Sequence, residues 1–280
     1  MTGASGILAW LAPRAVPGIE TIETAPQQRG GLVAYRRSLR GPDGARVAVA
    51  EVVDDVATTT DADLARAFDL GGRAARVEAD AVLLRAAADH DAPALADAIA
   101  ASPALAQPGC ADAHEMLVRA IVGQQISVAA ATLQLGLLAA AGDPLPASLA
   151  DAAVHRLFPT MAQVVEGADL LRGPAAKTAA VRRAAEAVAS GEIEVSPGAD
   201  LERMRAELLA LKGIGPWTVG YLSLRLGDPD VLLLGDVAVR KGARRLGIDD
   251  LPAVAASCAG HRSALMLRCW AAAARPSTTA

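Results

Sequence analysis

From about residue 78 to the C-terminus, the sequence alternates between helical segments and short proline- and glycine-rich breaks, and strand patterns nearly vanish. Helical periodicity is indicated over the ranges 78–88, 93–101, 112–122, 125–141, 148–154, 160–166, 175–190, 200–211, 216–226, 236–246 and 261–274. Breaks such as Gly142-Asp143-Pro144 and Pro197-Gly198 separate these segments. This part of the chain is therefore predicted to be built of short α-helices.

The N-terminal part has a different pattern, because two of its segments alternate in the manner of strands. Residues 32–39 and 46–53 show strand character, and the GPDGA between them is rich in turn-forming residues, which predicts a hairpin. A helix over 61–69 follows, with Asp61 as its cap. We predict a small α+β domain over residues 1–75, followed by an all-α region over 76–280.

The charge of the chain bears on whether it binds nucleic acid. The formal net charge is −4, which argues mildly against such binding, because neutralisation of phosphates drives it. Residues 1–109 hold 10 basic and 14 acidic residues, whereas residues 110–280 hold 17 of each. The excess acid is thus confined to the first part, and a neutral domain can bind DNA when its cations share one face.

Cysteine usage and hydropathy exclude several classes of protein. Three scattered cysteines provide neither a disulfide framework nor the pairs and runs typical of zinc and iron–sulfur sites. The N-terminus has no signal-peptide pattern, and no apolar run is long enough for a membrane span. We therefore expect a soluble cytoplasmic monomer without a metal or cofactor.

The most specific local pattern is Leu211-Lys212-Gly213-Ile214-Gly215-Pro216-Trp217-Thr218, between two helical segments. Its glycines allow a tight turn and a close approach of the backbone to a ligand, and the proline suits the first position of a helix. The N–H groups at the start of that helix suit a phosphate oxygen. Ile214 would anchor the turn in the core. An ordinary helix–helix connection is the alternative interpretation.

In this context the sequence resembles a known family. LKGIGPWTVGYLSLR, followed by LLLGDVAVRKGARRLG, is similar to the helix–hairpin–helix and Gly/Pro…Asp loop of the base-excision DNA glycosylases, in particular the 3-methyladenine DNA glycosylase II branch. Further matching stretches are PGCADAHEMLVRAIVGQQISVAAA (108–131), the helix after RGPAAK, HRSALMLRCW (261–270) and LAPRAVPGIETI (11–22). The resemblance implies a mainly α fold of two helical lobes with a cleft between them. The sequence departs from the family at its start, which is about one strand short of the expected sheet domain, so we expect a truncated N-terminal antiparallel sheet that lies away from the chemistry. It also implies that the chain acts on double-stranded DNA containing a damaged base and is associated with the bacterial nucleoid.

Asp236, 19 residues after Trp217, is the carboxylate that the resemblance marks as catalytic. Breaking the glycosidic bond of an alkylated purine builds positive charge on the sugar, and a fixed carboxylate stabilises that charge and can orient or deprotonate water. The alternative role for an Asp that follows Gly235 is the N-cap of the next helix. Both roles can hold together.

Three aromatic residues are candidates for a base pocket. Trp217 and Tyr221 are four residues apart and share a helix face, while Trp270 matches an aromatic pocket position of the family. Aromatic stacking offsets part of the cost of flipping a base, and an electron-rich ring favours a cationic base. Buried core aromatics are the alternative.

Trp217 also bears on the type of reaction. In related glycosylases that nick the strand, a lysine at this position forms a Schiff base, which a tryptophan cannot do. Lys212 lies on the other side of the hairpin and is interpreted as a phosphate contact. The expected reaction is hydrolysis without lyase activity.

Further DNA contacts are predicted on two other segments. Gln124 and Gln125 are expected to begin a helix and resemble the segment that fills the gap left by a flipped base, with Gln125 at the wedge position. A polar helix start is the alternative. Arg240 and Arg244 share one face of a short helix after Asp236, where they supply either backbone contacts or only a solvated surface.

Two functions follow from these patterns. The first is a monofunctional DNA glycosylase that removes alkylated purines such as 3-methyladenine and 7-methylguanine by base flipping, in base-excision repair. The second is a non-catalytic module that binds damaged DNA or regulates its repair through the same hairpin.

Overall fold

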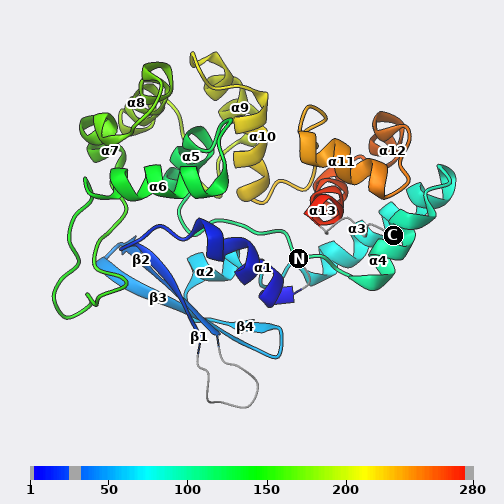
Figure 1. Ribbon diagram of the computed structural model, residues 1–280, viewed down its shortest axis with the longest axis horizontal. Helices are drawn as coiled ribbons and strands as arrows, with labels where there is room; N and C mark the ends of the chain where they lie inside the picture. Colours follow the sequence, from blue (N-terminus) through cyan, green and yellow to red (C-terminus); the bar gives the residue numbers. More distant parts are fainter. Residues whose placement is uncertain (1–2, 25–32, 275–280) are drawn as a thin grey trace.

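The computed structural model describes residues 3–24 and 33–274, and within these ranges the protein is mainly α-helical with one small sheet (Figure 1). The strands are β1 Glu20–Thr24, β2 Val33–Gly41, β3 Gly44–Val53 and β4 Val56–Thr58. They pair in this order and all antiparallel, with Tyr35 of β2 opposite Ala50 of β3. The predicted hairpin is thus confirmed, and β1 and β4 extend it on either side.

One face of this sheet packs against α1 (Gly3–Leu11) and α2 (Ala62–Ala67), which lie between the sheet and the other helices (Figure 1). In β3 the side chains of Ala48, Ala50 and Val52 are buried, while the residues between them point outward. This is the period of two that a sheet with one solvated face requires. Asp61 caps α2 through its carboxylate, as predicted.

A first helical lobe consists of six consecutive helices around one core. They are α5 Ala113–Val122, α6 Val128–Ala139, α7 Met161–Gly167, α8 Ala175–Ala189, α9 Leu201–Ala210 and α10 Pro216–Arg225. The 3-10 turn η1 (Ala12–Arg14) connects α1 to the strand region, and a second such turn, η2 (Ala168–Leu170), extends α7. Buried Val16 and Ile19, which follow η1, belong to the same core.

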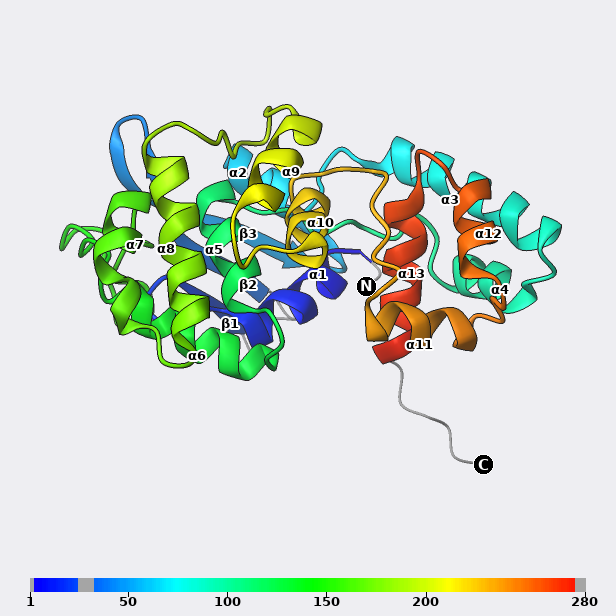
Figure 2. The ribbon, with the colours of Figure 1, turned by 90° about the horizontal axis from the view of Figure 1, so that it is seen from above.

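A second helical lobe joins two segments that are far apart in the sequence (Figures 1 and 2). Its helices are α3 Arg73–Asp89, α4 Pro93–Ala101, α11 Val237–Arg245, α12 Leu251–Ser257 and α13 Arg262–Ala274. A Cβ at Gly242 of α11 would lie 1.8 Å from the Cys269 carbonyl oxygen of α13, so only glycine allows these helices to pack so closely. Buried Arg268 of α13 pairs with Asp80 of α3 at 2.7 Å.

The helices differ from the predictions at several places. Residues 148–154 form no helix, because the backbone there turns at Pro146 and then forms an isolated bridge between Val154 and Gly18. Conversely, α1 and α12 form at positions where no helix was predicted, with Asp250 as the cap of α12. No helix of the described residues is long and apolar enough to cross a membrane.

Candidate active site and DNA-binding surface

The predicted hairpin between α9 and α10 forms as the sequence indicates. Ile214 is buried in the core of the first lobe, and Pro216 opens α10. Gly213 has φ +97°, and a Cβ there would lie 2.9 Å from the Cβ of Ala180 in α8. Lys212, beside these glycines, is exposed. The hairpin thus combines a fixed backbone, an exposed lysine and the N-terminal end of α10, which together suit a phosphate group.

Gln124 and Gln125 do not begin a helix, and in this respect the prediction is wrong. They lie in the loop between α5 and α6, because Ser127 is the residue that caps α6. The Gln124 side-chain amide donates to the Gly213 carbonyl at 3.2 Å and to the Thr218 hydroxyl at 2.5 Å. The loop is therefore attached directly to the hairpin.

Gln125 itself is exposed at the tip of this loop, with φ +59°. Behind it, the Lys177 ammonium donates to the carbonyls of Val122 and Gln124, at 3.2 and 2.5 Å. Burial lowers the pKa of Lys177. The lysine ties the last turn of α5 to α8 and so fixes the position from which the Gln125 side chain projects.

Asp236 lies at the start of α11, and both of its carboxylate oxygens are occupied. Oδ1 accepts the Val239 backbone N–H at 2.9 Å, which confirms the N-cap role. Oδ2 accepts the indole N–H of Trp217 at 2.8 Å, and Oδ1 also accepts that of Trp270 at 3.3 Å. Three donors from three helices, none of them a counter-ion, orient this carboxylate.

The three aromatic residues singled out in the sequence lie together. Trp217 and Tyr221 are stacked, with ring centroids 5.2 Å apart and planes 15° apart. Tyr221 and Trp270 meet edge to face at 6.2 Å. All three are only partly buried, so their surfaces remain available to a ligand in the cleft.

A fourth aromatic, Trp10 of α1, is an element of the site that the sequence analysis missed. Its ring stacks on that of Trp270 with centroids 6.0 Å apart and planes 19° apart, and it lines the same cleft. The expectation that the α+β region lies away from the site is therefore wrong. The rarity of tryptophan, three in 280 residues, is the one sequence signal that could have drawn attention to Trp10.

The cleft has a volume of about 580 Å³, enough for a purine and part of its sugar. All three parts of the fold line it: α1 and the sheet, α5 and α6 with their loop, and the start of α11 with the end of α13. Cys110 lies in its wall, where burial raises the pKa of the thiol to about 11. The described residues contain no group of three His, Cys, Asp or Glu side chains that could hold a metal ion.

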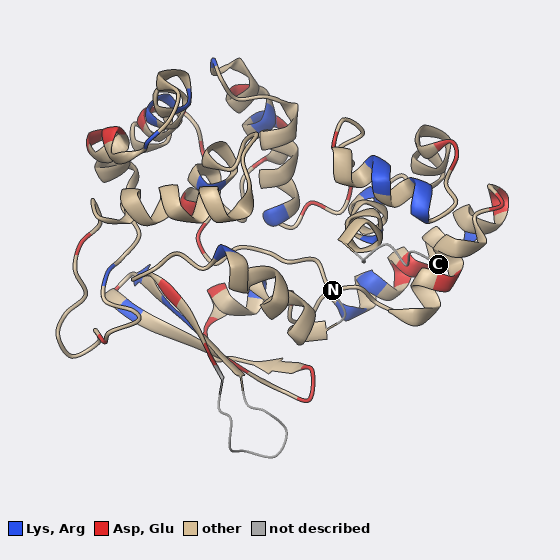
Figure 3. Ribbon diagram, viewed as in Figure 1, with Lys and Arg blue, Asp and Glu red and all other residues tan. Residues whose placement is uncertain are grey.

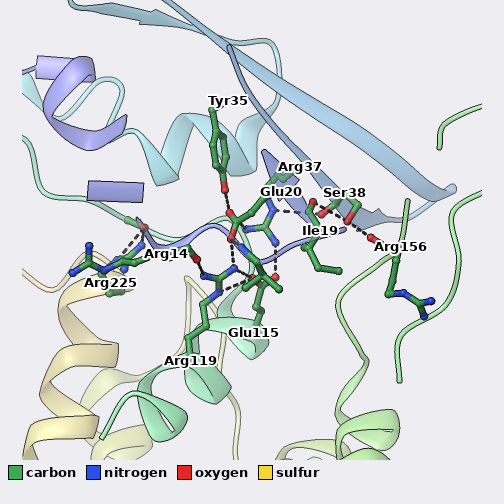
Figure 4. A network of polar contacts seen from close by, with 12 residues as sticks. Arg14, Ile19, Glu20, Tyr35, Arg37, Ser38, Glu115, Arg119, Arg156 and Arg225 are labelled. Carbon is green, nitrogen blue, oxygen red and sulfur yellow. Dashed lines mark hydrogen bonds and ion pairs between the residues drawn. The ribbon is translucent and has the colours of Figure 1, made fainter. Parts of the chain in front are cut away.

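A buried ion-pair network lies beneath the cleft and connects the sheet to α5 (Figure 4). Glu20 of β1 pairs with Arg119 of α5, and Arg37 of β2 pairs with Glu115 of α5. Burial alone would raise the pKa of Glu20, but the Arg119 and Arg37 guanidiniums lower it to about 2. Tyr35 donates its hydroxyl to Glu20, and burial, together with the charge of that carboxylate, raises the pKa of the tyrosine.

Basic residues gather on α11, directly after Asp236 (Figure 3). Arg240, Lys241 and Arg244 are exposed, whereas Arg245 is partly buried and donates to the carbonyls of Ala272 and Ala273. Of these four residues of α11, Arg240, Lys241 and Arg244 are therefore placed to contact a ligand outside the protein. Lys241 also lines the cleft.

No protein-family model matches the chain. It is 32% identical over 259 residues to a probable bifunctional transcriptional activator/DNA repair enzyme AlkA of Mycobacterium tuberculosis, covering 87% of this chain and 48% of that protein. The chain thus spans about half the length of this relative. It is also 30% identical over 249 residues to the DNA-3-methyladenine glycosylase 2 of Escherichia coli, covering 85% of this chain and 82% of that one.

Solved structures share the fold at lower sequence identity. The 3-methyladenine DNA glycosylase of Archaeoglobus fulgidus superposes with a TM-score of 0.70 at 17% identity, covering 96% of this chain and 94% of that one. The 8-oxoguanine glycosylase/lyase of Clostridium acetobutylicum, solved with double-stranded DNA, gives 0.61 at 15% identity, over 91% and 98% of the two chains. The fold is therefore that of the helix–hairpin–helix DNA glycosylases, and the extended match to the Escherichia coli enzyme shows that this chain belongs to the AlkA family of DNA-3-methyladenine glycosylases.

Proposed function

We propose that this protein is a monofunctional DNA glycosylase that hydrolyses the N-glycosidic bond of alkylated purines flipped out of duplex DNA. The observation that carries the proposal is the Asp236 carboxylate, held by the indoles of Trp217 and Trp270 at the edge of an aromatic cleft. The names of the Escherichia coli and Archaeoglobus fulgidus relatives support the choice of alkylated bases.

Electrostatic stabilisation is the main role proposed for Asp236. As the glycosidic bond breaks, positive charge develops on the sugar, and a preorganised carboxylate lowers the energy of that state. Its hydrogen bonds come from an amide and two indoles, none of which brings a positive charge to it. The same bonds occupy lone pairs that a general base would use, so attraction for the oxocarbenium-like sugar is favoured over deprotonation of water.

Binding to the duplex is assigned to the face that carries the hairpin. Lys212 and the backbone of Gly213, Ile214 and Gly215 would hold a phosphate at the start of α10. Gln125 would enter the duplex from the neighbouring loop, with Gln124 fixing that loop to the hairpin. Arg240 and Arg244 of α11, which are exposed, would contact the sugar–phosphate backbone of the DNA.

Hydrolysis without strand cleavage is proposed because a tryptophan occupies the hairpin-proximal position next to Asp236. Lys241 is a lysine that lines the cleft, so it is the residue to test for a Schiff base. Borohydride should trap no covalent complex between the wild-type protein and DNA containing an abasic site. If borohydride traps a complex with wild type but not with Lys241→Met, the protein is a lyase that uses Lys241, and this part of the proposal is wrong.

The substrate class is tested by mass spectrometry of bases released from alkylated, deaminated and oxidised duplex DNA. We expect release of 3-methyladenine and 7-methylguanine from alkylated DNA. Affinity for an abasic-site analogue, together with no base released from any of the three DNAs, would instead favour a module that only binds damaged DNA.

A further inference from the structure

Arg14, at the end of η1, places a positive charge in the wall of the cleft. Its guanidinium carbon lies 3.5 Å from the centroid of the Trp10 ring, and its Nη1 donates to the Trp10 carbonyl at 2.7 Å. A planar cation stacked on an indole at this separation makes a cation–π contact. Arg14 thus already occupies a face of Trp10 on which a flat cationic base could otherwise stack.

Two carboxylates of the cleft wall, Glu20 and Glu115, do not neutralise this charge, because other arginines bind them (Figure 4). Glu20 pairs with Arg119, and Glu115 pairs with both Arg37 and Arg119. Within the described part of the chain, Arg14 has no ion-pair partner. Burial lowers the pKa of Arg14, in keeping with a cation that lacks a counter-ion.

A second guanidinium reinforces the positive charge on the same side of the pocket. Arg225 donates through Nη1 to the Tyr221 hydroxyl at 3.1 Å and through Nε to the Gly109 carbonyl at 3.1 Å. Both arginines line the cleft, with Tyr221 next to them. Charges in a partly desolvated cleft act over several ångströms with little screening.

The buried ion-pair network fixes the position of Arg14. Arg119 of the buried network donates through Nη1 to the Arg14 carbonyl at 2.9 Å, which pins the turn that carries Arg14. Since the Arg14 guanidinium also donates to the Trp10 carbonyl, the residue is held both at its backbone and at the end of its side chain. It is a built element of the pocket wall, contributed by the N-terminal part of the chain.

We propose that Arg14 is a specificity-determining residue that disfavours positively charged bases in the pocket relative to neutral ones. This inference rests on the proposed function. A 3- or 7-alkylated purine is cationic while it is attached to its sugar, so Arg14 repels it. It also cannot stack on the face of Trp10 that Arg14 covers. A neutral purine such as hypoxanthine can instead accept a hydrogen bond from the guanidinium.

The test is the ratio of single-turnover rates for release of 7-methylguanine, from a cationic nucleotide, and of hypoxanthine, from a neutral one. In Arg14→Gln this ratio should rise about tenfold, the effect of removing one charge at an effective dielectric constant near 20. Arg14→Lys keeps the charge and should leave the ratio within about threefold of wild type. Arg85→Gln removes an exposed arginine of α3 outside the cleft and is the matched control for net charge.

Arg14→Met, which keeps the aliphatic stem over Trp10, is measured in parallel in case the glutamine variant does not fold. Quenching of tryptophan fluorescence by 7-methyldeoxyguanosine and by deoxyinosine gives a second readout, and only the first nucleoside should bind more tightly after Arg14→Gln. The inference is overturned if wild type releases either base but the ratio in Arg14→Gln equals that in Arg85→Gln, or if Arg14→Lys shifts it equally. Release of neither base by wild type would overturn the proposed function itself, and this inference with it.

Discussion

At the scale of single residues, the surroundings of Asp236 explain how one carboxylate can be both a structural and a reactive group. Its backbone bond to Val239 fixes the start of α11, and the indoles of Trp217 and Trp270 fix the direction of its oxygens. The sequence left a choice between helix cap and catalytic carboxylate, and the geometry is compatible with both at once. The indole N–H groups are therefore proposed to position the carboxylate rather than to contact the base.

Trp217→Phe tests this positioning role, because it keeps an aromatic ring on Tyr221 but removes the donor to Oδ2. A hydrogen bond to a charged group contributes about 1.5–3 kcal/mol, so the single-turnover rate of base release should fall by roughly 10- to 100-fold. Affinity for duplex DNA in a gel shift should change little. Tyr221→Phe, which keeps the stack and donates nothing to Asp236, is the control; equal losses in the two variants would contradict the assignment.

At the scale of elements, the hairpin and the α5–α6 loop form one unit that is held by side-chain contacts to backbone carbonyls. Gln124 bonds the hairpin carbonyl of Gly213, and Lys177 bonds the last carbonyls of α5. These contacts explain why a loop with a residue at positive φ, Gln125, keeps a defined shape. The two hairpin glycines differ in backbone conformation and in the space around them.

Gly213→Ala should destabilise the protein by about 1–3 kcal/mol, because its φ is +97° and the new Cβ would meet Ala180 at 2.9 Å. Gly215→Ala should cost under about 1 kcal/mol, since nothing lies within 4 Å of its Cβ position and its φ is −116°. Urea unfolding of both variants measures the difference. Equal stability of the two variants would show that the turn is not strained at Gly213.

Sequence patterns predicted the elements whose signals are local, and they failed where the signal lies in contacts between distant residues. The β2–β3 hairpin, the caps at Asp61 and Asp236, and the burial of Ile214 each follow from a few neighbouring residues. Residues 148–154 have helical periodicity but form no helix, and Val154 instead bridges to Gly18, more than 100 positions earlier. Trp10 joins the site only through its stacking on Trp270, which no spacing rule could have indicated.

At the scale of the whole molecule, the sheet, the first lobe and the second lobe meet at the cleft, and buried arginines hold them together. Arg37 and Arg119 connect the sheet to α5 through Glu20 and Glu115, and Arg225 of α10 binds the Gly109 carbonyl between the lobes. Breaking a buried ion pair costs more than breaking a surface pair, because the remaining charge stays desolvated. The shape of the cleft should therefore depend on the protonation of this network.

Glu20→Gln should lower the free energy of unfolding by about 3 kcal/mol at pH 7. Because the pKa of Glu20 falls from its ordinary 4.5 to about 2 on folding, its contribution is complete above pH 4.5 and is lost as the pH falls toward 2. The stability difference between wild type and variant should shrink over that interval in denaturant titrations. Glu23→Gln, in an exposed pair with Arg36, is the control. If the difference in free energy of unfolding between wild type and Glu20→Gln does not depend on pH, the assignment is contradicted.

The central claim, that Asp236 drives cleavage of the glycosidic bond, is tested most directly by single-turnover release of 7-methylguanine from saturated duplex DNA. Asp236→Asn keeps a capping side chain for α11, so the variant should fold and bind DNA as wild type does. Its rate of base release should fall on the order of 100-fold or more, because the charge that stabilises the oxocarbenium-like sugar is gone. A variant that binds DNA normally and releases the base at the wild-type rate would contradict the account.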